Sequence, residues 1–176
     1  MQVTSDFGMK QLMAVANTRH GPAGHWHARV SVDGPDHDHL SDAEAAMAFL
    51  GSHSVTIPED APSLRQLRAL REIREAVRAG SGALDEVRAG ATYRLEVGPR
   101  LVPAGVGWDA IIAGLLIPLA ELEAQRASLR VCANPLCRFM FIDRSRNRSR
   151  VWCDMSGCGN RAKTSRYRQR HHATLA

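Results

Sequence analysis

"CANPLCRFMFIDRSRNRSRVWCDMSGC", residues 132–158, contains all four cysteines of the chain. The cysteines form two pairs, each with four residues between its members, and fifteen residues separate the pairs. Each pair can supply two thiolates from one tight turn, and the longer segment between the pairs lets the chain return. The spacing therefore predicts a tetrahedral zinc site whose ligands are Cys132, Cys137, Cys153 and Cys158.

Two disulfides or four free cysteines are the alternative interpretations. The first twenty residues do not show the pattern of a secretory signal peptide, so we expect a cytoplasmic protein, in which disulfides are rare. Four protein ligands would complete the coordination sphere and leave no position for a substrate. We therefore expect one structural Zn²⁺ per chain, which would supply much of the folding free energy of so small a module.

Positive charge is concentrated around the cysteines. From Arg130 to His172 the sequence has eleven Lys and Arg residues but only two acidic ones, whereas the remainder has twelve basic and sixteen acidic residues. This asymmetry indicates a polyanionic partner, usually nucleic acid and sometimes a membrane surface. The candidate nucleic-acid contacts are Arg144, Arg146, Arg148, Arg150, Lys163, Arg166, Arg168 and Arg170.

These cations lie on two predicted elements. Residues 138–152 are expected to form a hairpin with its turn at 144–147, and an extended conformation would place the alternate arginines of this segment on one side. A helix is expected after Cys158, with cations on two sides and no apolar stripe. Arg161, close to Cys158, is expected to balance the negative charge of the zinc-bound thiolates by donating to sulfur.

The chain upstream of residue 129 is predicted to be a small α+β body. Apolar periodicity and capping signals predict helices at 5–18, 41–51, 63–79 and 108–127, and strands within 27–34 and 92–102. Ser41 and Glu44 suggest a capping box that begins the second helix, and Gly51 suggests its end. The expected domains are a body at 1–128 and a zinc finger of knuckle, β-hairpin and helix at 129–176. The helix at 63–79 is expected to bury Leu64, Leu67, Leu70, Ile73 and Val77.

Three further features have competing interpretations. Asn17 and Thr18 follow a predicted helix and serve either as a polar cap or as ligand contacts of a sensor domain. The pairs His25/His27 and His37/His39 suggest either a second metal site or solvated loops. The most apolar run, residues 110–120, is too short to span a membrane, so we expect no membrane association. No catalytic motif is recognisable, so we expect no enzymatic activity.

Residues 132–170, "CANPLCRFMFIDRSRNRSRVWCDMSGCGNRAKTSRYRQR", closely resemble the CGNR zinc finger, which is named for the four residues at 158–161. The body more loosely resembles the ABATE domain that accompanies this finger, in "VANTR" at 15–19 and "SLRQLRALREIREAV" at 63–77, although residues 80–107 look shorter than is usual. The resemblance implies a bacterial transcription regulator with zinc held by the four cysteines and a finger that binds DNA.

Two classes of function follow. The leading hypothesis is a zinc-dependent transcription regulator whose basic finger binds duplex DNA. The alternative is a finger that acts as a protein-interaction or dimerisation module, giving a homodimer in which its arginines pair with acidic groups of a second chain. A third hypothesis, sensing of a small-molecule effector by the body, predicts an enclosed pocket near Asn17.

Overall fold

The computed structural model describes residues 3–22, 36–53, 55–79, 84–96, 100–124 and 128–173. Contacts divide the chain into two units, the first formed by residues 1–19 and 38–126 and the second by 20–37 and 127–176. Helices and short antiparallel strand pairs make the chain an α+β protein, as the sequence predicts. The predicted strand within 27–34 lies outside the described residues, as do His25 and His27.

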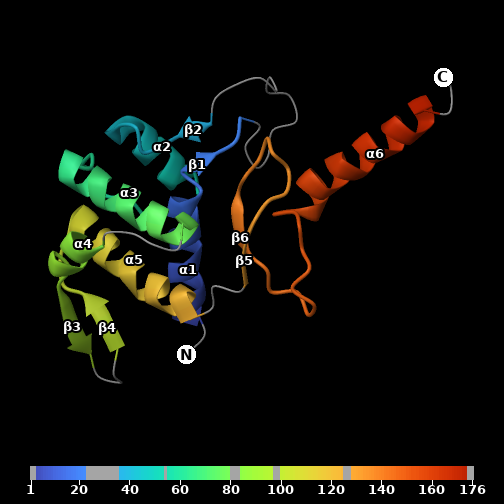
Figure 1. The fold of residues 1–176 in the computed structure, drawn as a ribbon. Coiled ribbons are helices and arrows are strands. Elements are labelled where there is room, and N and C mark those ends of the chain that lie inside the picture. Colours follow the sequence, from blue (N-terminus) through green and yellow to red (C-terminus); the bar gives the residue numbers. More distant parts are fainter. Residues whose placement is uncertain are drawn as a thin grey trace. The chain divides into compact units, whose positions relative to one another are not determined.

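Three helices form the core of the first unit, namely α1 (Val3–Ala16), α3 (Leu64–Ala79) and α5 (Gly107–Ala124). They pack side by side, as Figure 1 shows. Their apolar residues recur every three or four positions, so each helix turns one stripe toward the others. The buried side chains are Leu12, Val15, Leu67, Leu70, Ile73, Val77, Leu115, Leu119 and Leu122. The expectation for Leu64 is wrong, because this residue is 85% exposed.

Helix α2 (Ala43–Ser52) packs against α3 and begins two residues after the start of the predicted range 41–51. Its N-cap is Asp42, whose carboxylate accepts a 2.8 Å hydrogen bond from the N–H of Ala45. Ser41 instead donates its hydroxyl to Asp42 at 2.8 Å, so the predicted Ser41 capping box is wrong. The helix also passes through Gly51 and is capped by His53.

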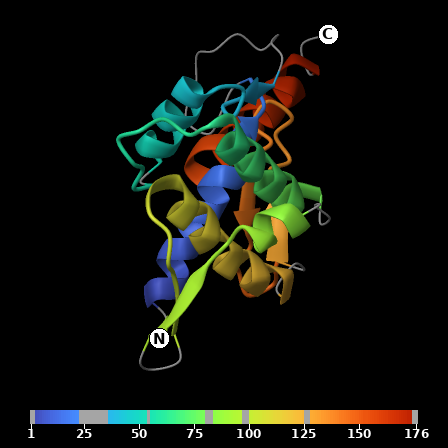
Figure 2. The same cartoon turned by 90° about the vertical axis from the view of Figure 1, so that its left-hand side faces the viewer.

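Two smaller elements complete the first unit. Helix α4 (Asp85–Ala89) packs against α5. Strands are predicted within 92–102, and here β3 (Tyr93–Glu96) and β4 (Arg100–Pro103) form an antiparallel pair (Figure 2). The hydroxyl of Tyr93 donates a 2.7 Å hydrogen bond to the carbonyl oxygen of Ala113, which anchors this pair to α5.

A buried arginine stabilises the return of the chain into the first unit. The short strands β1 (Arg19–His20) and β2 (His37–Asp38) pair with each other. The side chain of Arg74, on α3, is only 4% exposed and forms an ion pair with both carboxylate oxygens of Asp38. A buried guanidinium requires such a partner because an uncompensated charge in the interior is very costly.

The second unit contains β5 (Leu129–Val131), β6 (Met140–Ile142), the π-helical turn η2 (Met155–Gly159) and α6 (Asn160–Ala173). Strands β5 and β6 are antiparallel, and Met140 and Phe141 are buried. The hairpin therefore encloses the first cysteine pair, and the expectation of a hairpin between the two pairs is wrong. Across the parts of the chain that the structure describes, no helix is both long and apolar enough to span a membrane.

Candidate metal centre and basic surface

The four cysteine sulfurs of the second unit gather at one point. Their Sγ atoms all lie within 4.8 Å of one another, and the sulfurs of Cys132, Cys137 and Cys158 belong to buried residues. Sγ of Cys153 lies 3.6 Å from that of Cys137 and 3.8 Å from that of Cys158. A tetrahedral zinc with Zn–S bonds of about 2.3 Å separates its sulfurs by about 3.8 Å. The cluster therefore fits a single structural zinc held by four thiolates.

The ionisation of the cluster shows why a cation belongs there. The hydrogen bonds from Cys137 and Cys153 lower the pKa of the Cys132 thiol to about 2. The hydrogen bond with Cys132 raises the pKa of Cys137 to about 12, and the hydrogen bonds with Cys132 and Cys137 raise that of Cys153 as well. Thiols packed this closely oppose one another's ionisation unless a cation compensates their charge. A bound Zn²⁺ would replace the thiol protons and allow all four sulfurs to be thiolates.

Asn134 organises the first knuckle, which spans Cys132 to Cys137. Its side-chain oxygen accepts a 3.1 Å hydrogen bond from the N–H of Leu136, and its backbone carbonyl accepts one of 2.9 Å from the N–H of Cys137. Its amide nitrogen lies 3.5 Å from Sγ of Cys158, within range of an N–H···S hydrogen bond. Asn134 thus bridges the two knuckles and donates to the sulfur of a metal ligand. Nothing in the sequence pattern indicated this role of Asn134.

The second knuckle, Cys153 to Cys158, is shaped by Asp154. The Asp154 carboxylate accepts hydrogen bonds from the N–H of Gly157 at 2.8 Å and from both the N–H and the hydroxyl of Ser156. The N–H of Gly159 donates to the carbonyl of Asp154 at 3.0 Å, which closes the wider π-helical turn. Such a turn is often found at functional sites. It leads directly into α6, so the metal centre fixes where the basic helix begins.

A segment from near the start of the chain completes the first knuckle. The N–H of Gly21 donates to the carbonyl of Cys137 at 2.9 Å. The buried ring of His20 packs on Phe139, with 5.0 Å between ring centroids. Asp36 forms a 2.8 Å ion pair with Arg138, which has a left-handed backbone at φ 52°. Residues 20–22 and 36–37 are therefore structural parts of this unit.

A buried carboxylate holds the arginine-rich loop after β6. Asp143 is 1% exposed, and it accepts hydrogen bonds from the N–H and hydroxyl of Ser145 and from the N–H of Arg150. The Ser145 hydroxyl is the main reason that the pKa of Asp143 lies below its usual value, and the two backbone donors add to it. The chain between these anchors turns at 145–148, so the expected extended run of arginines is absent from this described loop.

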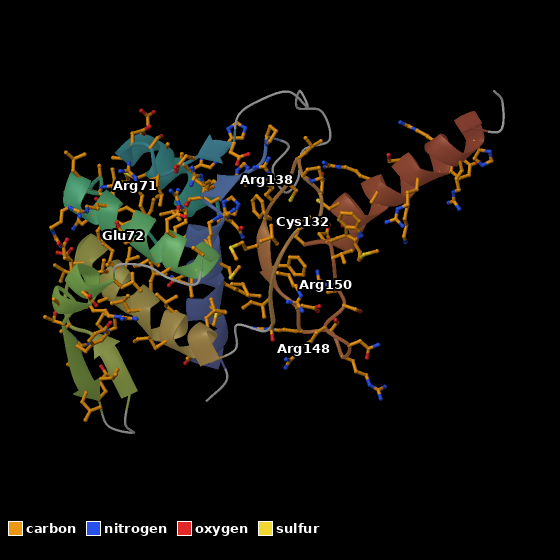
Figure 3. The ribbon with its side chains drawn as sticks, in the orientation of Figure 1. Arg71, Glu72, Cys132, Arg138, Arg148 and Arg150 are labelled. Atoms are coloured by element: carbon orange, nitrogen blue, oxygen red, sulfur yellow. The ribbon has the colours of Figure 1, made fainter. Side chains whose placement is uncertain are left out.

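Arg150 and Arg148, both labelled in Figure 3, have different surroundings in this loop. The guanidinium of Arg150 lies 5.1 Å from the ring centroid of Phe141 and donates a 2.7 Å hydrogen bond to the carbonyl of Cys153. Arg150 therefore supports the second knuckle. Arg144, Arg146 and Arg148 are exposed.

Helix α6 carries five cations and no acid. Lys163, Arg166, Arg168 and Arg170 are exposed, whereas Arg161 is half-buried in the first turn. In the described part of the chain, the side chain of Arg161 makes no hydrogen bond to a cysteine sulfur. The side chain that donates to a cysteine sulfur there is that of Asn134. Its role in balancing the charge of the site stays a prediction.

The remaining candidates lie away from the cysteines. Thr18 is fully buried and donates its hydroxyl to the carbonyl of Val15 at 2.7 Å, while Asn17 is 7% exposed at the end of α1. Asn17 and Thr18 thus lie in the arrangement expected at the end of a helix. Contact between either residue and a small-molecule ligand stays a prediction. Among the described residues, the cysteine cluster is the one group of potential ligands close enough to hold a metal.

Comparison with known families gives two matches along the chain. A family described as "ABATE: putative stress-induced transcription regulator" matches residues 13–126. The CGNR zinc finger matches residues 128–171, a range that contains all four cysteines and most of α6. A search of curated proteins finds no match.

Proposed function

The chain belongs to the ABATE family and carries a CGNR zinc finger, and from this premise we propose that it is a zinc-dependent, cytoplasmic transcription regulator whose second unit binds duplex DNA. The observation that carries the proposal is an excess of unpaired cations on that unit. Its described carboxylates are already occupied: Asp36 by Arg138, Asp143 by the arginine-rich loop and Asp154 by the second knuckle.

Five exposed cations are left without an acidic partner. Within the ranges that the structure describes, none of their side chains forms an ion pair or hydrogen bond. They are Arg146, Arg148, Lys163, Arg166 and Arg168. An isolated group of like charges is unfavourable unless water and counterions, or a polyanion, surround it. Phosphate contacts release the counterions condensed on DNA, and this release drives binding.

The shape of α6 supports a duplex as the partner. Its fourteen residues give a length of about 21 Å, and an α-helix of about 10–12 Å diameter fits the major groove of B-DNA. Beyond its first turn, its described side chains are exposed, so the helix has no apolar face to bury within its own unit. Tyr167 is the one aromatic residue of α6 and is 58% exposed. One aromatic ring is little for stacking on single-stranded bases.

The test is a titration of zinc-loaded protein with a duplex at several salt concentrations, followed by fluorescence anisotropy. Five phosphate contacts predict a slope of about −4.5 for log affinity against log salt. Replacing Lys163 and Arg166 by Gln should reduce the magnitude of that slope by about 1.8. The matched control replaces Lys10 and Arg94 of the first unit, and it should leave the slope unchanged.

Two results would count against DNA binding. One is the absence of binding at low salt by zinc-loaded protein, and the other is an equal effect of the two double variants. The alternative, that the cations join two copies of this chain, is tested on the same samples by light scattering. It would be supported by a dimer that dissociates when Lys163 and Arg166 are replaced and that does not bind DNA.

A further inference from the structure

A cleft lies within the first unit, among α3, α4 and α5. Its volume is about 640 Å³, within the range of about 300–1,000 Å³ that is typical of small-molecule sites. Asn17, where the sequence predicted a pocket, is not among the residues that line it. Neither the cysteine centre nor the basic surface contributes to the cleft.

The inner part of the cleft is apolar. Ala69 of α3, Val87 of α4, and Ile112 and Ala113 of α5 line it, and the last three are buried. Leu64 lies at its edge and is 85% exposed. The apolar stripe of α3 therefore continues past the core and ends at the cleft. An apolar group placed in the cleft would remove the exposed surface of Leu64 and Ala69 from water.

The cationic side chains of the cleft already have acidic partners. Arg65 forms a 2.7 Å ion pair with Asp109, which also accepts a 2.9 Å hydrogen bond from the amide of Gln66. The Gln66 hydrogen bond is the leading reason that the pKa of Asp109 lies below its usual value, so this residue is an anion at neutral pH. Arg68 lies 3.8 Å from the carboxylate of Glu86, a looser and exposed pair.

Two carboxylates of the cleft have no such partner. Glu72 is half-buried on α3, where Figure 3 labels it, and Asp85 begins α4. Neither side chain forms an ion pair with a cation that the structure describes. Because the cleft is lined by two arginines and four carboxylates, its uncompensated charge is negative. A carboxylate at the edge of an apolar cleft attracts a cation more strongly than one in bulk water does.

We propose that this cleft is a binding site for a small organic cation with an apolar body. The cationic group of the ligand pairs with Glu72, and its apolar part covers Ala69, Val87, Ile112 and Ala113. An inorganic cation would leave the exposed side chain of Leu64 uncovered, and an anion would meet Glu72 and Asp85. Binding at this site is independent of DNA binding, so a failure of either proposal can be recognised without the other.

The test uses three probes that share a phenyl ring and an aliphatic chain: 4-phenylbutylamine, the neutral 4-phenylbutan-1-ol and the anionic 5-phenylpentanoate. Each is titrated into ¹⁵N-labelled full-length protein while amide chemical shifts are recorded. The amine should give saturable shifts at Ala69, Glu72, Val87 and Ala113. The alcohol should bind more weakly than the amine, and the carboxylate should bind most weakly.

A charge-neutralising pair of variants isolates the role of Glu72. Replacing Glu72 by Gln should lower the affinity for the amine about two- to fivefold, the range of a partly exposed ion pair, and should leave the affinity for the alcohol unchanged. Glu44→Gln makes the same charge change on α2, outside the cleft, and should leave both affinities unchanged. The proposal is overturned if the amine gives no saturable shifts at the lining amides. It is also overturned if the carboxylate binds as tightly as the amine, or if the two variants have equal effects.

Discussion

The backbone N–H of Gly21 donates a 2.9 Å hydrogen bond to the carbonyl oxygen of Cys137, a ligand of the metal centre. A Cβ atom on Gly21 would lie 2.5 Å from the carbonyl oxygen of Leu136 and 3.1 Å from the nitrogen of Cys137. Neither of these atoms can move without moving the knuckle. The first cysteine pair is therefore shaped by a glycine more than a hundred residues earlier in the chain.

Replacing Gly21 by Ala should destabilise the second unit by about 1–3 kcal/mol, the usual cost of forcing an extra group into a packed site. Zinc should also be released more readily. The measurements are thermal unfolding and zinc transfer to a chromogenic chelator. Gly90→Ala is the control, because Gly90 has an ordinary right-handed backbone and a Cβ there would meet nothing closer than 3.5 Å. Equal zinc release from both variants would refute the importance of the close approach.

Replacing Cys153 by Ser should lower the zinc content from about one ion per chain to nearly none, because the tetrahedral set loses a thiolate. Elemental analysis measures the metal. In NMR spectra, the amides of the second unit should lose their dispersion, whereas those of α1, α3 and α5 should keep theirs, since the first unit has its own core. Zinc retained at one ion per chain would contradict the assignment of this ligand.

Arg146 and Arg150 should separate DNA affinity from zinc retention. Arg146→Gln should weaken DNA binding, reduce the magnitude of the salt slope by about 0.9 and leave zinc release unchanged. Arg150→Gln removes the 2.7 Å hydrogen bond to the Cys153 carbonyl and should cost about 1.5–3 kcal/mol in the stability of the zinc-loaded unit. Anisotropy and chelator transfer measure the two effects. If the two variants changed DNA affinity and zinc release to the same extent, Arg146 and Arg150 would not differ in role.

Asp38 should make the stability of the first unit depend on pH. Burial alone would raise its pKa, but the hydrogen bonds from Arg74 and Leu40 hold that pKa below its usual value. Its contribution is therefore present above the unfolded-state pKa and is lost as the pH falls through the lower, folded-state pKa. Asp38→Asn should destabilise the unit by about 1–3 kcal/mol at pH 7, because the charge of buried Arg74 is then less compensated.

The difference between Asp38→Asn and the unchanged protein should shrink as the pH falls below about 4. Chemical unfolding followed by circular dichroism measures it. Glu96→Gln, which removes an exposed ion pair with Arg94, should cost less than about 1 kcal/mol at any pH. A difference for Asp38→Asn that did not change with pH would exclude this ionisation as its source.

The cysteine spacing predicted the metal centre because four thiolates in two tight turns are a local requirement, visible in 27 residues of sequence. The helices at α3 and α5 were predicted because burial of one face imposes a period that the sequence must show. The cap of α2 was misplaced by one residue, since Ser41 and Asp42 are both good caps. Only the hydrogen bond to Ala45 distinguishes them.

Other features depend on tertiary contacts that leave no periodic signal. Gly21 resembles any loop glycine until its approach to Leu136 is known. Arg150 has the same residue type and spacing as Arg146 and Arg148, yet it stacks on Phe141. Leu64 continues the apolar stripe of α3, and sequence alone could not show that the helix extends beyond the core at this point.

The pairing of Gly21 with Cys137 also has a consequence for the order of events during synthesis. A ribosome that adds about 5–20 residues per second needs on the order of ten seconds to reach Cys137 after it has made Gly21. Helix α1 already precedes Gly21, and the other helices of the first unit are synthesised in that interval, so they can pack on α1. The zinc centre forms only after Cys158 has been made, so the nascent protein can take up its metal only after all the helices of the first unit have been synthesised.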